Sequence, residues 1–308
     1  MKNHAFLILA HNQPRLLTRT LSHLSAPNHH FFINVDAKSK HYKEMVDFVN
    51  KHKGEANVHF IKKPVACYWA GISLVDAEIK LLKTAMEYPV EFDYYHLISG
   101  TDYPLRSNDQ FDAFFENTDD SFMCFNFEED IDYWMPIYKM KTNQYHTNGK
   151  HTFCEKVFLR IVNSRAGRTL FKRKPLPTLA GGWQWFSWSD NVVKYVLDYL
   201  AEHPNFRRRF NHTSSPDEHF FTTMLYSHLD ELKIRKHFPL RYISWHAYRE
   251  IETKKRPYNL NELDYDRVIN SAAFFCRKVD EMESAKFLDM VDEQRGNRYD
   301  ITEHDYFF

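Results

Sequence analysis

The first hundred residues alternate short apolar runs with longer amphipathic segments, and this alternation constrains the fold more than any other feature. The apolar runs at 5–10, 31–35, 58–61 and 94–98 have the length of buried strands. The segments at 14–24, 42–53 and 73–87 carry apolar residues at helical spacing, and Pro14 suits a first helical position. Strands that alternate with helices predict an α/β fold, with a mainly parallel central sheet covered by helices on both faces.

The second half of the chain is less regular. We expect strands within 122–127 and 181–190, and helices at 191–202, 214–229 and 281–293. No internal repeat, low-complexity tract or Gly/Ser linker interrupts the chain, which favours a single domain over residues 1–308.

Composition excludes several classes of protein. The chain has 41 Lys+Arg and 41 Asp+Glu, so it lacks the basic excess typical of nucleic-acid partners. Aromatic residues make up 16% of the chain, enough for a sizeable core. The four cysteines form no CxxC pair, which favours free thiols in a reducing compartment. No apolar stretch reaches the length of a signal peptide or membrane span, so we expect a cytoplasmic protein.

The common nucleotide and hydrolase motifs are absent. The sequence contains no GxGxxG, GxxxxGK[ST], GxSxG or HExxH. The second strand is followed by Asp36-Ala37-Lys38 rather than by a metal-binding DxD. Ligands of such sheets bind beyond the carboxyl ends of the strands. Those ends carry His11, Asp36 and the turn 99–102, which makes them the first candidates for a site.

Seven segments resemble one enzyme family, in the family's order. They are ILAHNQP (8–14), FINVDAKS (32–39), YWAGISLVDAEIKLL (68–82), YHLISGTDYPLRS (95–107), GGWQWFSWSD (181–190), SSPDEHFF (214–221) and FFCRKVD (274–280). The chain resembles the core-2/I-branching β-1,6-N-acetylglucosaminyltransferases, a family that includes the peptide O-xylosyltransferases.

The resemblance implies a GT-A-like fold and inverting transfer of GlcNAc or xylose from a UDP-sugar to a hydroxyl of a glycan or glycoconjugate. It implies no metal or other cofactor, since basic side chains neutralise the diphosphate in these enzymes. A nucleotide-sugar half would span about 1–120, and an acceptor and catalytic half about 121–308.

The same resemblance assigns the catalytic and phosphate-binding residues. Glu218 matches the catalytic base, although Ser215 to Glu218 also reads as a capping box in which Glu218 is only a helix cap. Lys278 matches the lysine that contacts the diphosphate. The second cation is less clear, because Tyr258 stands where the family often carries arginine, and Arg256 or Lys255 would then supply the charge.

The remaining candidates have structural alternatives. Asp36, His11 and Asp102 would bind the nucleotide-sugar, but the first two could cap the following helices and Asp102 could satisfy its own turn. Trp183 and Trp185 would lie on one face of a strand, either as an acceptor platform or as core. The basic stretch 157–174 is either a helix on an anionic membrane or an ordinary surface segment.

Two other functions remain open at this point. A metal-dependent GT-A transferase of another class would use Asp36 or Asp102 as a metal ligand. A non-catalytic carbohydrate-binding protein would use the aromatic surface without any affinity for UDP.

Overall fold

A seven-stranded sheet forms the centre of the molecule in the computed structural model, which describes residues 1–125, 131–146, 152–176, 178–236, 238, 240–244 and 257–295. Its strand order is β3-β2-β1-β4-β7-β6-β8. The strands are β1 (His4–Ala10), β2 (His29–Val35), β3 (Asn57–Phe60), β4 (Tyr94–Ser99), β6 (Ser121–Met123), β7 (Phe186–Ser189) and β8 (Ile234–Arg235). Strands β1 to β4 are parallel, and β7 is antiparallel to both β4 and β6.

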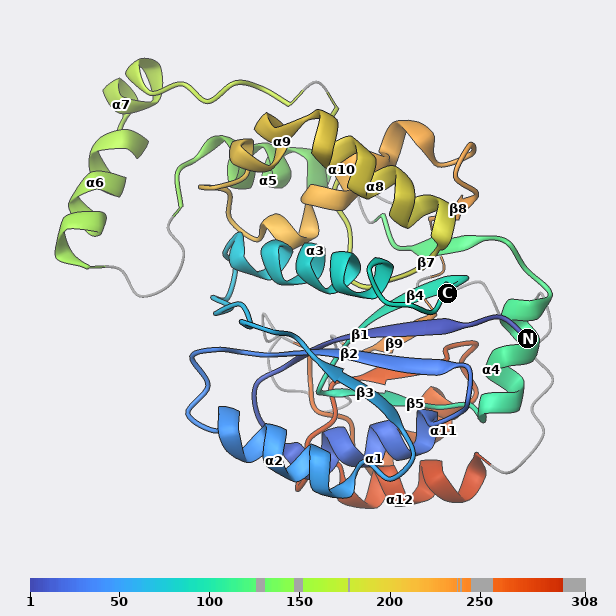
Figure 1. The fold of residues 1–308 in the computed structure, drawn as a ribbon. Coiled ribbons are helices and arrows are strands. Elements are labelled where there is room, and N and C mark those ends of the chain that lie inside the picture. The colour runs from blue at the N-terminus through green and yellow to red at the C-terminus, as the bar shows by residue number, and fades with distance from the viewer. Residues whose placement is uncertain are drawn as a thin grey trace.

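Helices cover both faces of this sheet (Figure 1). Helices α1 (Pro14–Leu24) and α2 (Tyr42–His52) lie on one face, and α3 (Ser73–Met86) and α8 (Asp190–Glu202) lie on the other. Alternate residues of β1 enter the two cores: Phe6 and Ile8 pack with α1 and α2, whereas Ala5 and Leu7 pack with α3 and α8. The predicted α/β class with a mainly parallel sheet is confirmed.

A second sheet brings the distal part of the chain back to the first half. Its three strands have the order β5-β10-β9. They are β5 (Asp102–Pro104), β9 (Arg241–Ile243) and β10 (Phe275–Arg277). Strand β10 pairs antiparallel with β5, with Arg277 opposite Asp102. Residues 102–104 and 275–277, which are far apart in the sequence, therefore meet beside the carboxyl end of β4.

The other elements complete the layers. They are α4 (Asn108–Glu116), α5 (Ile131–Asn143), α6 (Phe153–Asn163), α7 (Arg165–Leu170), α9 (Pro204–Arg209), α10 (Phe220–Leu225), α11 (Tyr265–Ile269), α12 (Ala285–Gln294) and the 3-10 helices η2 (Pro216–Glu218), η3 (Tyr226–His228) and η4 (Glu262–Asp264). Helices α6 and α7 project from the body as an arm (Figure 1). Among the described residues, no helix combines the length and apolarity that crossing a bilayer requires.

Two predicted elements differ from the structure. The expected helix 214–229 is divided into η2, α10 and η3, because Ser215 has a left-handed backbone (φ 47°) and His219 leaves the helical region (φ −127°). The expected strand 181–190 begins only at Phe186, so Trp183 and Trp185 precede it.

Candidate active site

The carboxyl ends of β1 and β2 bring His11 and Asp36 together. The Asp36 N–H donates to the Ala10 carbonyl (2.8 Å). Asp36 Oδ1 accepts from the backbone N–H groups of Lys38 (3.0 Å) and Cys67 (3.2 Å), and Oδ2 lies 2.6 Å from Lys38 Nζ. The helix-cap alternative for both residues is wrong, since the N-cap residues of α1 and α2 are Gln13 and His41.

His11 lies beside three charged groups. Partial burial lowers its pKa, Lys38 and Lys278 lower it further, and the Asp36 carboxylate opposes them. Its carbonyl accepts from Ser39 Oγ (2.6 Å), which joins the loops after β1 and β2. Lys278 is therefore within electrostatic reach of His11, although 267 positions of sequence separate them.

The second sheet explains how Lys278 reaches this edge. Lys278 directly follows β10, and the next residue, Val279, donates its N–H to the Thr101 carbonyl (3.0 Å). Thr101 belongs to the turn that follows β4, so Lys278 lies beside that turn, and its side chain is partly buried. His11, Asp36 and Lys278 thus converge at the carboxyl ends of three neighbouring strands.

Asp102 supports this turn from within. Its carboxylate is 1% exposed and accepts from the Ser99 N–H and Ser99 Oγ, both at 2.9 Å. Arg277 Nη1 lies 3.4 Å from Asp102 Oδ1, and the Arg277 guanidinium covers the Trp185 ring at 3.9 Å. The alternative in which Asp102 satisfies its own turn is thereby borne out, and this buried group shapes the loop without facing solvent.

Trp183 and Trp185 pack against other parts of the protein and are largely shielded from solvent. Trp185 is 8% exposed, with one face against Arg277. Trp183 is partly buried against the core on the α3 side, and its N–H donates to the Cys124 carbonyl (3.1 Å). The expected shared strand face does not exist, and Trp185 offers no open ring face to a sugar.

Glu218 is the last residue of η2, and its side chain pairs with Lys141 instead of capping the helix. Ser215 makes no side-chain capping bond, so the capping-box alternative is wrong. Glu218 Oε2 accepts from Lys141 Nζ on α5 at 2.6 Å, and its side chain is 40% exposed. The Gly182 N–H donates to the Glu218 carbonyl (2.9 Å), and a Cβ at Gly182 would overlap the Cys124 carbonyl. Glycine at 182 is therefore required to hold this backbone.

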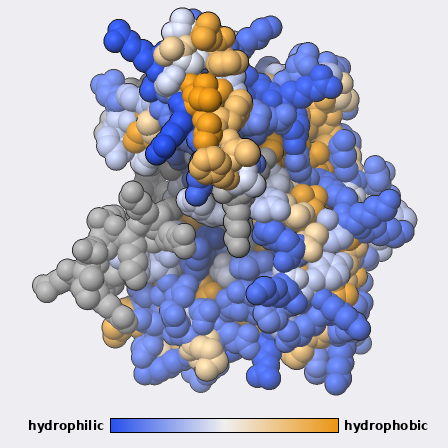
Figure 2. Space-filling model, turned by 90° about the vertical axis from the view of Figure 1, so that its left-hand side faces the viewer, coloured by the Kyte–Doolittle hydropathy of each residue, from blue (hydrophilic) through white to orange (hydrophobic). Residues whose placement is uncertain are grey.

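One loop connects the two groups of candidates. In the segment 65–72 the Cys67 N–H donates to Asp36, and the Ala70 carbonyl accepts from the Ser215 N–H (3.0 Å). Glu218 and Asp36 therefore border the same edge of the sheet. Figure 2 looks onto that edge and shows a hollow beneath the projecting arm.

Sequence reasoning missed four groups at this edge. Lys141 carried no signal, because the helix that holds it has no clear apolar period. Trp69, next to the Ala70 contact, is 80% exposed. Glu78 lies on the apolar face of α3 with Val75, Leu82 and Ala85. A charged residue at a position where the helical period requires an apolar one could have identified Glu78 from the sequence. Gln184 Nε2 donates to Glu78 Oε1 at 2.5 Å.

Burial raises the pKa values of two carboxyl groups next to Glu218, those of Asp217 and Glu78. Burial and the nearby Glu218 carboxylate raise the pKa of Asp217 to about 7. Burial and the charge of Asp217 raise the pKa of Glu78 well above its usual value. Glu218, partly exposed and paired with Lys141, is the carboxylate of this group that faces solvent. The predicted second cation, Arg256 or Lys255, lies outside the described residues.

Similarity to known proteins identifies the family of this chain. A model of the core-2/I-branching enzyme family matches residues 4–269. Rat xylosyltransferase 2 is 25% identical over 233 residues, covering 72% of this chain and 24% of that protein. Human xylosyltransferase 2 is 24% identical over 312 residues, covering 94% of this chain and 33% of that protein. The chain thus spans about a quarter to a third of the length of these relatives.

Mouse xyloside xylosyltransferase 1 in its apo form aligns with a TM-score of 0.41 at 13% identity, over 91% of this chain and 96% of that one. The family match spans β1 to α11 and includes His11, Asp36, Asp102 and Glu218. On that match, the chain belongs to the core-2/I-branching enzyme family.

Proposed function

We propose that this protein is an inverting, metal-independent glycosyltransferase that moves GlcNAc or xylose from a UDP-sugar to a hydroxyl of a glycan or glycoconjugate. The observation that carries the proposal is the position of the Glu218 carboxylate. It is partly exposed, held by Lys141, and connected through the loop 65–72 to the edge where His11, Asp36 and Lys278 meet. Family membership supports the same reaction, and the names of the relatives favour xylose as the first sugar to test.

Glu218 is the general base in this proposal. Its carboxylate removes the proton of the acceptor hydroxyl, whose oxygen forms a bond to the anomeric carbon while the bond to the diphosphate breaks. UDP leaves from the opposite face with the electron pair. The ion pair with Lys141 fixes the position of the Glu218 carboxylate. Burial raises the pKa of the neighbouring Asp217 to about 7 and that of Glu78 well above its usual value, which reduces the repulsive charge behind Glu218.

Lys278 stabilises the charge that develops on the leaving diphosphate. The carboxylates that a metal-dependent transferase would use are already paired with cations: Lys38 Nζ lies 2.6 Å from Asp36, and Arg277 Nη1 lies 3.4 Å from Asp102. This pairing favours the metal-independent reaction. The nucleoside would lie against His11 and Asp36, and exposed Trp69, rather than Trp183 or Trp185, would stack on the acceptor sugar.

UDP release over a panel of UDP-sugars tests the function. Each donor is offered with glycan acceptors, with EDTA and with Mn²⁺. Release that requires UDP-xylose or UDP-GlcNAc and an acceptor, unchanged by EDTA, supports the proposal. Turnover only with Mn²⁺ would replace it by a metal-dependent transferase. Glycan affinity without UDP affinity in a calorimetric titration would make the protein a carbohydrate-binding module.

We also propose that the arm of α6 and α7 contacts an anionic membrane while the site acts on its acceptor. The arm lies on the side of the molecule where the strands end, and Figure 2 shows its apolar surface. Large apolar side chains are exposed along it: Phe153 (81%), Val157 (40%), Phe158 (47%), Ile161 (57%), Leu170 (78%) and Phe171 (48%). Placing these side chains in a lipid headgroup region removes them from water.

Charge on the arm fits the same partner. Between 152 and 174 the single acidic residue is Glu155, against the basic residues Lys156, Arg160, Arg165, Arg168, Lys172, Arg173 and Lys174. Arg173 does not face outward, because its guanidinium donates to the carbonyls of Gln144 and His212, which leaves the other six as cations for a membrane. Each cation near an anionic surface adds about 1 kcal/mol. This density stands out in a chain of zero formal net charge.

Vesicle flotation tests the membrane contact. The protein should float at low salt with vesicles that contain phosphatidylserine, and not with neutral vesicles. Replacing Phe153 and Leu170 by Ser should abolish flotation, whereas Lys51→Glu on α2 should leave it intact. No flotation of the wild type at low salt would remove the membrane from the proposal and leave the transfer reaction untouched.

A further inference from the structure

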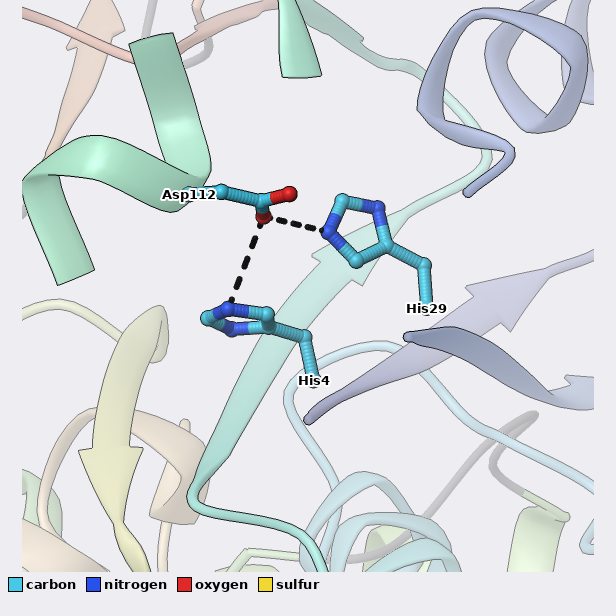
Figure 3. Close-up of side chains that lie close together, drawn as sticks. All are labelled: His4, His29 and Asp112. Carbon is cyan, nitrogen blue, oxygen red and sulfur yellow. Dashed lines mark hydrogen bonds and ion pairs between the residues drawn. The ribbon is translucent and has the colours of Figure 1, made fainter. Parts of the chain in front are cut away.

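Two histidines and an aspartate converge at the edge of the sheet opposite the candidate active site (Figure 3). His4 begins β1, His29 begins β2, and the two are direct neighbours in the parallel register. Asp112 reaches them from α4. Both histidine side chains are fully buried, and the Asp112 side chain is 15% exposed. Three rigid elements thus fix the cluster, which retains a narrow opening to solvent at Asp112.

The donor atoms have the spacing of a metal site. His29 Nε2 lies 2.8 Å from Asp112 Oδ1, and His4 Nε2 lies 3.6 Å from the same oxygen. All three donor atoms lie within 4.8 Å of one another. Zinc bonds of about 2.0–2.2 Å in a tetrahedron place ligand atoms roughly 3.3–3.5 Å apart. Small side-chain adjustments bring these atoms to that spacing.

The hydrogen bonds of His29 determine which of its ring nitrogens faces the cluster. His29 Nδ1 lies 2.6 Å from the Leu24 carbonyl, which can only accept, so the proton is on Nδ1. The other ring nitrogen, Nε2, faces a carboxylate oxygen of Asp112. Two acceptors at 2.8 Å repel each other unless a cation lies between them.

His4 gives a second, independent indication. Its Nε2 has no hydrogen-bond partner, although the side chain is fully buried. Its Nδ1 lies 3.0 Å from His96 Nε2, and His96 Nδ1 lies 2.9 Å from Ser187 Oγ, a chain of the kind that orients metal-ligating histidines. A proton on His29 would satisfy Asp112 but would leave His4 Nε2 unpartnered.

We propose that His4, His29 and Asp112 bind one divalent transition-metal ion, zinc in the first instance, with water in the fourth position. Two imidazole nitrogens and one carboxylate suit zinc, whereas calcium and magnesium require oxygen ligands. The ion would join β1, β2 and α4 at the edge remote from Glu218. It has no part in the transfer reaction, so this inference is independent of the proposed function.

Zinc uptake by the full-length chain tests the site. The protein is dialysed against EDTA and then against metal-free buffer, zinc is added, and bound metal and melting temperature are measured after gel filtration. We expect one zinc per chain and a higher melting temperature with zinc. Asp112→Asn and His29→Gln should bind at least about a hundredfold more weakly, since even losing an outer-shell partner costs about 10–100-fold.

His59→Gln serves as the matched control. His59 pairs with His30 (3.2 Å) on the same sheet but lies outside the cluster, so this variant should bind zinc like the wild type. A wild type without zinc, or cluster variants that bind as tightly as the wild type, would overturn the proposal. If the cluster variants do not fold, the absorption spectrum of the cobalt-loaded wild type decides: tetrahedral ligand-field bands support the site, and their absence overturns it.

Discussion

The two ends of strand β1 carry the same residue in opposite settings. His4 at its start is fully buried among Tyr94, Phe111 and Phe115, with a pKa of about 3. His11, directly after its end, is exposed beside Asp36 and Lys278. The strand starts are closed by α4 and aromatic rings, whereas the strand ends open into the hollow of Figure 2. The setting of each histidine therefore depends on its position along the strand: the start of β1 is buried, and the end of β1 carries the proposed site.

This comparison predicts that variants at the strand ends change turnover and variants at the strand starts change stability. The largest effect should come from Glu218→Gln. Glutamine keeps an oxygen for Lys141 but cannot accept the acceptor proton, and a general base contributes about 10²–10⁴-fold. We expect at least a hundredfold loss of kcat (the lower bound of that range), retained UDP binding and a melting temperature within a few degrees of wild type.

The opposite end provides the control for Glu218→Gln. His29→Gln should lower the melting temperature and leave kcat close to wild type. Near-normal transfer by a stable Glu218→Gln variant would contradict the role of Glu218 and direct the search for a base to Asp217. A large loss of kcat in His29→Gln at a temperature where it is folded would contradict the prediction that variants at the strand starts change stability alone.

Lys278→Ala should have the next largest effect. Removing one preorganised donor to a developing anion costs about 10²–10³-fold, so we expect kcat and kcat/KM to fall by about a hundredfold. A change confined to KM would mean that Lys278 binds the ground state and the transition state equally. Lys286→Ala is the matched control, since Lys286 is exposed and pairs with Glu262 (3.7 Å). Equal kinetics for both variants would move the phosphate-binding role to Arg256 or Lys255.

The two ends should also respond oppositely to pH. The pKa of Asp217 is raised to about 7, so folding takes up a proton there and stability falls as the pH rises from about 4 to 7. The pKa of His4 is lowered to about 3, so stability at that end falls as the pH drops below about 6.5.

Urea denaturation at pH 5 and pH 8 measures the Asp217 contribution. Between these values the wild type should lose at most about 3 kcal/mol of unfolding free energy relative to Asp217→Asn. Parallel pH profiles of the two proteins would show that Asp217 is ionised in the folded state. His4 contributes equally to both proteins and cancels in the difference.

The smallest effect should come from Trp69→Ala. An aromatic stacking contact is worth about 0.5–1.5 kcal/mol, so the KM for the acceptor should rise about 2- to 10-fold with little change in kcat or donor KM. Initial rates at varied acceptor concentration measure this. An unchanged acceptor KM would exclude Trp69 from the acceptor site.

Sequence reasoning located the parallel half of the sheet and the family, because β1 to β4 combine strand-length apolar runs with helical periods between them. It did not find β8, β9 or β10, which have two or three residues each and carry no period. For the same reason it could not predict the ion pairs of Arg277 with Asp102 and of Lys141 with Glu218. These pairs depend on long-range contacts. The cap at Ser215 followed a valid motif, but the left-handed backbone at that residue prevents the capping geometry.

The pairing of β10 with β5 has a consequence for how the protein is made. Strands β1 to β4 can pair with one another once residue 99 has been synthesised, since all four lie before that point in the chain. Arg277 and Lys278 arrive 175 or more residues later, and closing so long a loop is slow. We therefore expect a nascent chain to acquire a folded sheet well before it can hold a diphosphate. A nascent chain would then bind the donor only after residue 278 has been synthesised and the second sheet has formed.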